Sequence, residues 1–67
     1  MRVAVVVARF NDFITERLLE GATAALAEAG LSGDSVEVLR VPGAFEIPIA
    51  AQRLAETGQV EAVICLG

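Results

Sequence analysis

An unbroken apolar run from Val3 to Ala8, built only of valine and alanine, constrains the fold of this chain more than any other feature. A strand with one face in solvent alternates apolar and polar side chains, whereas a run without alternation is typical of a strand buried on both faces of a parallel sheet. The run stops at Arg9, Phe10 and Asn11. We therefore predict an α/β fold whose first strand, Arg2 to Ala8, lies inside a parallel sheet.

Two further short segments rich in valine and other apolar residues, Val36 to Val41 and Val60 to Leu66, are expected to form the second and third strands. Helical patterns separate the strands, which predicts the order βαβαβ with right-handed crossovers. Strand order 2-1-3 places the two helices on opposite faces, whereas order 1-2-3 leaves one face bare and suits such apolar strands poorly. We therefore expect order 2-1-3, with a crevice bordered by Phe10 and Gly67 where the winding direction reverses.

Capping and stop signals predict where the two helices begin and end. Asn11 or Asp12 is expected to be the N-cap of the first helix, and Gly30 its stop signal. Pro48 fits the first turn of the second helix, which Gly58 closes. The apolar stripe of the first helix is expected to comprise Ile14, Leu18, Ala22, Ala25 and Ala29, and that of the second includes Ile49, Ala50 and Leu54.

The chain is more apolar than a lone domain of its size needs to be, because 55% of its 67 residues are hydrophobic. A domain this small buries only about 60% of the surface that its unfolded chain exposes, so its own core leaves it marginally stable. We expect additional burial, supplied by oligomerisation, by further sequence or by both.

Charge and hydropathy exclude several partners. With a net charge of −4, no lysine and no basic run, the chain has no electrostatic footprint for nucleic acid or for an anionic membrane. No apolar run approaches the roughly 20 residues that span a bilayer, and no signal segment opens the chain, so we expect a soluble, cytoplasmic protein. Cys65, the single cysteine, lies in an apolar run without charged neighbours, and we expect a buried core thiol.

Missing residue types remove most catalytic chemistry. The chain has no histidine, no lysine and no cluster of metal ligands, so nucleophilic and zinc mechanisms lack their parts. No glycine-rich phosphate loop follows the first strand, where ARFND stands instead. We therefore expect no metal site, and we expect neither a dinucleotide nor a nucleoside triphosphate as ligand.

Candidate binding residues follow the first two strands. Phe10 stands at the end of a buried strand, where its ring can stack on a heteroaromatic ligand or serve as an ordinary core or interface residue. The segment from Val41 to Pro48 brackets Gly43 with two prolines, so its backbone can approach a ligand closely. Glu46 can accept hydrogen bonds from ligand hydroxyls or merely complement the helix dipole.

The arginines are weaker candidates. Arg9, Arg17, Arg40 and Arg53 could each hold a phosphate, but scattered arginines usually pair with surface carboxylates. Glu46 is a poor candidate for a general base, because the sequence offers it no acid–base partner. The residues alone therefore predict a small α/β unit with an aromatic-bearing ligand rim.

Three segments together carry a family resemblance: ARFNDFITERLLEGA, VPGAFEIPIAAQRLAETG and VEAVICLG. They closely resemble the amino-terminal half of the 6,7-dimethyl-8-ribityllumazine synthase family, along essentially the whole chain. The resemblance implies a flavodoxin-like three-layer parallel sheet, of which residues 1–67 form the amino-terminal part of one domain. It also implies homo-oligomers, either pentamers or icosahedral shells of pentamers.

The resemblance implies a transferase of riboflavin biosynthesis. The family condenses 5-amino-6-(D-ribitylamino)uracil with 3,4-dihydroxy-2-butanone 4-phosphate and uses no metal or organic cofactor. By resemblance, Phe10 stacks on the pyrimidine, Ala44 and Phe45 lend backbone contacts, and Glu46 holds the ribityl hydroxyls. Asn11 and Gly43 match positions that shape the loops.

The family's histidine for proton transfer, its glycine-rich phosphate turn and a later arginine match no residue of this chain. We therefore expect no catalytic residue among residues 1–67, and we expect a polypeptide of this length to bind the uracil weakly without catalysing the condensation. Two alternatives remain open. The chain can belong to a non-catalytic flavin- or pterin-binding module, or to a shell-forming scaffold of the same fold.

Overall fold

Three parallel strands and two helices alternate along the protein, and the computed structural model describes residues 1–67. In chain order the elements are β1 (Val3–Ala8), α1 (Asp12–Glu28), β2 (Val36–Val41), α2 (Ile47–Thr57) and β3 (Ala62–Leu66). Short 3-10 turns at Gly33–Ser35 and Ala44–Glu46 precede β2 and α2. The predicted order βαβαβ is confirmed.

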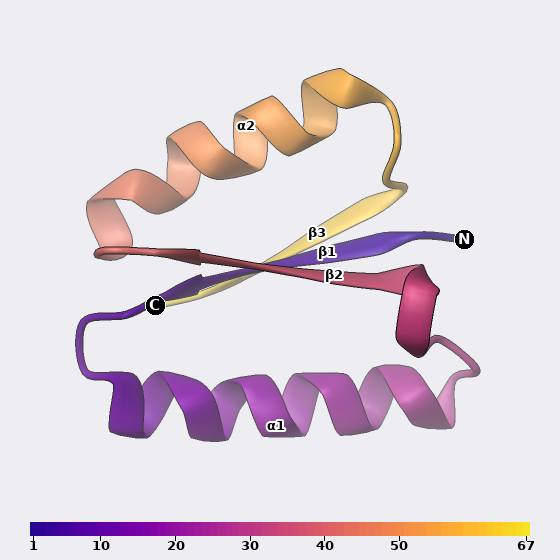
Figure 1. Ribbon diagram of the computed structural model, residues 1–67, viewed down its shortest axis with the longest axis horizontal. Coiled ribbons are helices and arrows are strands. Elements are labelled where there is room, and N and C mark those ends of the chain that lie inside the picture. The colour runs from indigo at the N-terminus through magenta and orange to yellow at the C-terminus, as the bar shows by residue number, and fades with distance from the viewer.

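The sheet has the order β2-β1-β3 with every pair parallel, as the sequence predicts. Val3 pairs with Val36 on one side and with Ala62 on the other. All residues of β1 are buried, at 3% exposure or less, because the strand has a neighbour on both edges and a helix on both faces. Figure 1 shows the sheet edge-on, with α1 covering one face and α2 the other.

The core under α1 joins Val5 and Val7 of β1 to Leu19. Leu26 of the helix packs against this cluster, as do partly buried side chains of the outer strands. Thr15 is also buried, and its hydroxyl donates to the Asn11 carbonyl oxygen at 3.4 Å. This internal bond lets a polar side chain occupy the buried face.

The predicted stripe of α1 is therefore displaced by one position. Ile14 is 58% exposed and Leu18 is 45% exposed, whereas the next residue in each case is buried. Ala25 and Ala29, also predicted to face the sheet, are exposed, and Ala22 is half-buried. Two overlapping stripes run along this helix, and the structure buries the one that contains Thr15 and Leu19 rather than the predicted one.

Cys65 is exposed, so the prediction of a buried thiol is wrong. It pairs with Val6 and shares the face of the sheet that carries α2. The difference arises because β3 is an edge strand, and α2 does not cover this position. The third strand also begins at Ala62 rather than Val60.

The predicted helix boundaries are confirmed at three signals. Asn11 is the N-cap of α1. Gly30 follows the end of α1 at a φ of 88°, and Gly58 caps α2 at a φ of 69°. Side chains are disfavoured at such angles, so both glycines stop their helices in the expected way. Neither helix is long and apolar enough to cross a membrane.

Candidate ligand-binding rim

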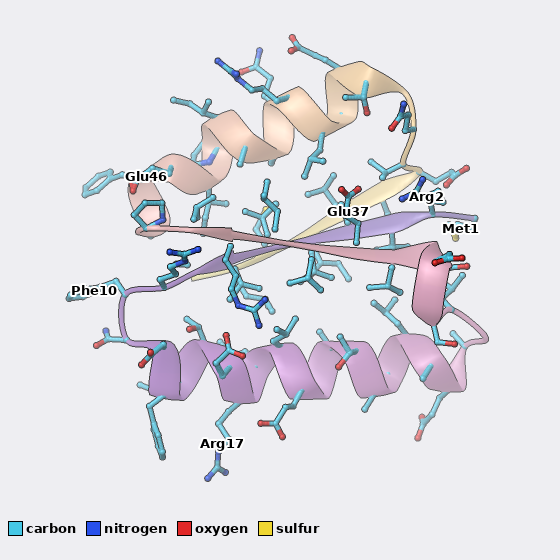
Figure 2. The ribbon with its side chains drawn as sticks, viewed as in Figure 1. Met1, Arg2, Phe10, Arg17, Glu37 and Glu46 are labelled. Atoms are coloured by element: carbon cyan, nitrogen blue, oxygen red, sulfur yellow. The ribbon has the colours of Figure 1, made fainter.

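Two loops leave the carboxyl end of the sheet together. The first, Arg9 to Asn11, follows β1, and the second, Pro42 to Glu46, follows β2. Figure 2 shows Phe10 and Glu46 at this end of the molecule, whereas Met1 and Arg2 lie at the other. We call these two loops the rim. The parallel topology thus brings the two sequence-predicted motifs to one edge.

Backbone hydrogen bonds join the two loops of the rim. The Arg9 N–H donates to the Val41 carbonyl at 2.7 Å, and the Phe10 N–H donates to the Pro42 carbonyl at 3.1 Å. These bonds lie at the end of the β1–β2 ladder and extend the pairing of the two segments beyond the strands themselves. The backbone that carries Phe10 is therefore fixed against the backbone that leads into Gly43.

Asn11 shapes the first loop through its backbone. Its φ of 60° and ψ of 47° place it in the left-handed region, which asparagine tolerates better than most residues. Its carbonyl accepts the N–H groups of Ile14 and Thr15 at 3.0 and 3.1 Å. Its side chain makes no capping hydrogen bond. The sharp turn lets the chain leave β1 and enter α1 at once.

Gly43 and Glu46 form the compact part of the second loop. The Glu46 N–H donates to the Gly43 carbonyl at 3.2 Å and closes the 3-10 turn. A Cβ placed on Gly43 would lie 3.5 Å from Glu46 Oε1, so the carboxylate lies close to the glycine. Glu46 is exposed and makes no side-chain hydrogen bond or ion pair within the protein. Its oxygens are free to accept hydrogen bonds from a ligand.

Aromatic side chains of the rim are open to solvent. Phe10 is 72% exposed and Phe45 is 94% exposed. The core interpretation of Phe10 is therefore excluded within residues 1–67. An exposed phenylalanine offers its ring face for stacking on a flat ligand or for burial against another protein surface.

The end of β3 approaches the second loop. A Cβ placed on Gly67 would lie 2.9 Å from Ile47 Cδ1 and 3.5 Å from Ala44 Cβ. Gly67 therefore borders the Ala44–Glu46 turn. Its lack of a side chain permits this close approach. The predicted crevice between Phe10 and Gly67 is not observed, because the one groove of the structure lies between β2 and α2 and is lined by neither residue.

A groove of about 440 Å³ lies between β2 and α2, on the face opposite α1. Its lining includes Leu39, Val41, Ile49 and Leu54, together with Glu46 and Arg53. Sequence reasoning did not single out Leu39 or this use of Arg53. Leu39 lies on the side of β2 that faces α2, and Arg53 lies on α2 beside the groove. Predicting these positions would have required the strand register and the rotation of the helix about its axis.

Charged residues near the rim are partly paired. Arg40 forms an ion pair with Glu16 at 3.1 Å, and the Arg17 guanidinium lies 5.3 Å from the Phe13 ring centre. Arg9 and Arg53 form no ion pair. No group of three or more acidic, cysteine or histidine side chains is placed to hold a metal ion.

One carboxyl at the opposite end of the sheet is perturbed. The Arg2 backbone N–H donates to Glu61 and lowers the pKa of that carboxyl below its ordinary value of 4.5, with smaller contributions from the amino terminus and the Arg2 charge. This group lies far from the rim along the strands, so it bears on stability rather than on binding.

These features define a class: a doubly wound parallel α/β unit with the strand order β2-β1-β3 and one helix on each face of the sheet. Within that class the family is shown, because the profile of the 6,7-dimethyl-8-ribityllumazine synthase family matches residues 1–67. The chain belongs to this family.

Relatives agree with the family match. The chain is 53% identical to a 6,7-dimethyl-8-ribityllumazine synthase of Desulfatibacillum aliphaticivorans, over 98% of this chain and 43% of that protein. It is 54% identical to a protein of the same name from Syntrophus aciditrophicus (strain SB), over 100% of this chain and 44% of that protein. The chain therefore spans less than half the length of these curated relatives.

Proposed function

We propose that residues 1–67 are the amino-terminal part of a single-domain lumazine synthase of riboflavin biosynthesis. The whole protein would condense 5-amino-6-(D-ribitylamino)uracil with 3,4-dihydroxy-2-butanone 4-phosphate. One observation carries the proposal: the two motifs that the family resemblance rests on meet at one rim, where hydrogen bonds at 2.7 and 3.1 Å join their backbones. The family match over residues 1–67 supports it.

In this proposal the rim binds the uracil substrate. The exposed ring of Phe10 stacks on the pyrimidine, and the backbone of Ala44 and Phe45 contacts its edge. The free carboxylate of Glu46 accepts hydrogen bonds from the ribityl hydroxyls. Asn11 and Gly43 hold the two loops in shape. Holding the amine in reacting geometry with the ketone can supply roughly 7 to 11 kcal/mol in favourable cases.

The remaining chemistry belongs to residues outside this segment. In this proposal the histidine for proton transfer and the phosphate-binding turn, which the family resemblance implies, lie beyond residues 1–67, which contain no histidine. No metal or organic cofactor enters this proposal. We also propose that the whole protein assembles into pentamers or into an icosahedral shell of pentamers, and that it is cytoplasmic.

Turnover by the whole protein tests the proposal. Purified protein given both substrates should form the lumazine, followed by its absorbance and fluorescence, well above the uncatalysed background. Glu46→Gln should raise the KM for the uracil about tenfold or more, because hydrogen bonds to a charged group contribute about 1.5–3 kcal/mol. Glu56→Gln, which alters an exposed carboxylate of α2, is the matched control and should change little.

Two outcomes would replace the proposal with another function. Quenching of flavin fluorescence without any turnover would identify a flavin- or pterin-binding module of the same fold. Assembly into shells with neither turnover nor binding would identify a scaffold.

A further inference from the structure

Arg40 of β2 and Glu16 of α1 form a bidentate ion pair. The Arg40 Nε donates to Glu16 Oε2 at 3.3 Å, and its Nη2 donates to Glu16 Oε1 at 3.1 Å. It is the single side-chain to side-chain hydrogen-bonded contact between a helix and a strand in residues 1–67. A planar guanidinium that bonds both oxygens of a carboxylate fixes orientation as well as distance.

The two residues of the pair lie close in sequence to the two loops of the rim. Glu16 lies near the start of α1, which follows the Phe10 loop, and Arg40 directly precedes Val41, whose carbonyl binds the Arg9 N–H. Both ends of the pair therefore lie within a few residues of the rim. Neither side chain belongs to the rim itself.

Apolar packing joins α1 to β2 at Val36, the first residue of that strand, rather than at its end near Arg40. The helix faces the sheet with the buried Thr15 and Leu19, and Leu26 packs against the cluster of Val5, Val7 and Leu19. Val38, on the same face of β2, remains 36% exposed, so the helix leaves this edge strand partly uncovered. The ion pair supplies the contact that packing does not.

We propose that Arg40 and Glu16 are positioning residues for the uracil-binding rim. By holding the start of α1 against the end of β2, the pair fixes Phe10 relative to the Gly43–Glu46 loop. The inference rests on the proposed function, since it concerns how the same rim is held. Lysine cannot replace Arg40 fully, because its ammonium group is a point charge and cannot form the two parallel hydrogen bonds that the planar guanidinium forms with a carboxylate.

Steady-state kinetics of the whole protein test the inference. Arg40→Gln and Glu16→Gln should each raise the KM for the uracil about two- to five-fold, which is the size that an exposed ion pair supports. The double variant should be no worse than either single variant, because each change already removes the whole interaction. The KM for the butanone phosphate and the kcat at saturation should stay unchanged.

A second ion pair provides the matched control. Arg2 and Glu37 lie 3.7 Å apart with similar exposure, at the opposite end of the strands, so Arg2→Gln should leave the KM for the uracil unchanged. An equal rise in KM in Arg2→Gln, or no rise in Arg40→Gln, would overturn the inference. Wild-type protein without lumazine formation would instead overturn the proposed function, so the two failures are distinguishable.

Discussion

At the scale of single residues, Asn11 and Glu46 show how much of the rim depends on backbone geometry. The sequence predicts that each of them lies in a loop directly after a strand. It does not predict the left-handed turn at Asn11 or the approach of Glu46 to Gly43. Both depend on how the chain leaves the strand, which a one-dimensional pattern does not encode.

Asn11 gives a prediction at this scale. Asn11→Gly should keep the fold and its stability, whereas Asn11→Val should destabilise the protein by about 1–2 kcal/mol, because a β-branched residue is strained at a φ of 60°. Urea unfolding of the two variants measures the difference. Equal stability of the glycine and valine variants would contradict the assigned backbone conformation.

At the scale of elements, the strand order was predictable and the helix phase was not. The uninterrupted Val3 to Ala8 run requires cover on both faces of its strand, and the order β2-β1-β3 supplies it because the two helices then lie on opposite faces. Leu18 and Leu19 are neighbours that lie on different stripes of α1, so the sequence pattern alone could not decide which of them is buried. The structure selects the one with Thr15 and Leu19, where an internal hydrogen bond satisfies the threonine.

A pair of neighbouring leucines tests this correction. Leu19→Ala should lower the free energy of unfolding by about 2–5 kcal/mol, since it opens a cavity against the β1 valines. Leu18→Ala removes a side chain that is 45% exposed and should lower it by about 1 kcal/mol or less. Denaturant unfolding measures the free energy of unfolding of both variants. A larger loss in Leu18→Ala than in Leu19→Ala would show that the stripe predicted from the sequence is the buried one.

Glu61 links β3 to the start of the chain and gives a pH prediction. Its pKa is lower in the folded state than its ordinary value of 4.5, chiefly because the Arg2 backbone N–H donates to it. The carboxylate therefore stabilises the fold above about 4.5, and this contribution is lost as the pH falls through the folded pKa.

Unfolding between pH 7 and pH 3 should show a smaller acid-induced loss of stability in Glu61→Gln than in the wild type. Glu28→Gln, an exposed carboxylate at the end of α1, serves as the control and should follow the wild-type curve. Parallel curves for wild type and Glu61→Gln would show that the Arg2 contact does not hold.

At the scale of the whole molecule, burial is confined to a narrow centre. Only 9 of 67 residues are buried, and β1 supplies most of them. Large apolar side chains of both helices and of the rim remain exposed, among them Phe13 and Ile49. This surface agrees with the expected need for further cover, and the chain covers 43–44% of the relatives' lengths.

The central claim is that the Phe10 rim binds the pyrimidine, and equilibrium binding of 5-amino-6-(D-ribitylamino)uracil to the whole protein tests it most directly. Phe10 and Phe13 are matched, at 72% and 74% exposure. Phe10→Ala should weaken binding about tenfold, since stacking of a base on an aromatic ring contributes about 1–3 kcal/mol, and Phe13→Ala should leave the Kd unchanged. Equal Kd values for the wild type and Phe10→Ala would contradict the claim.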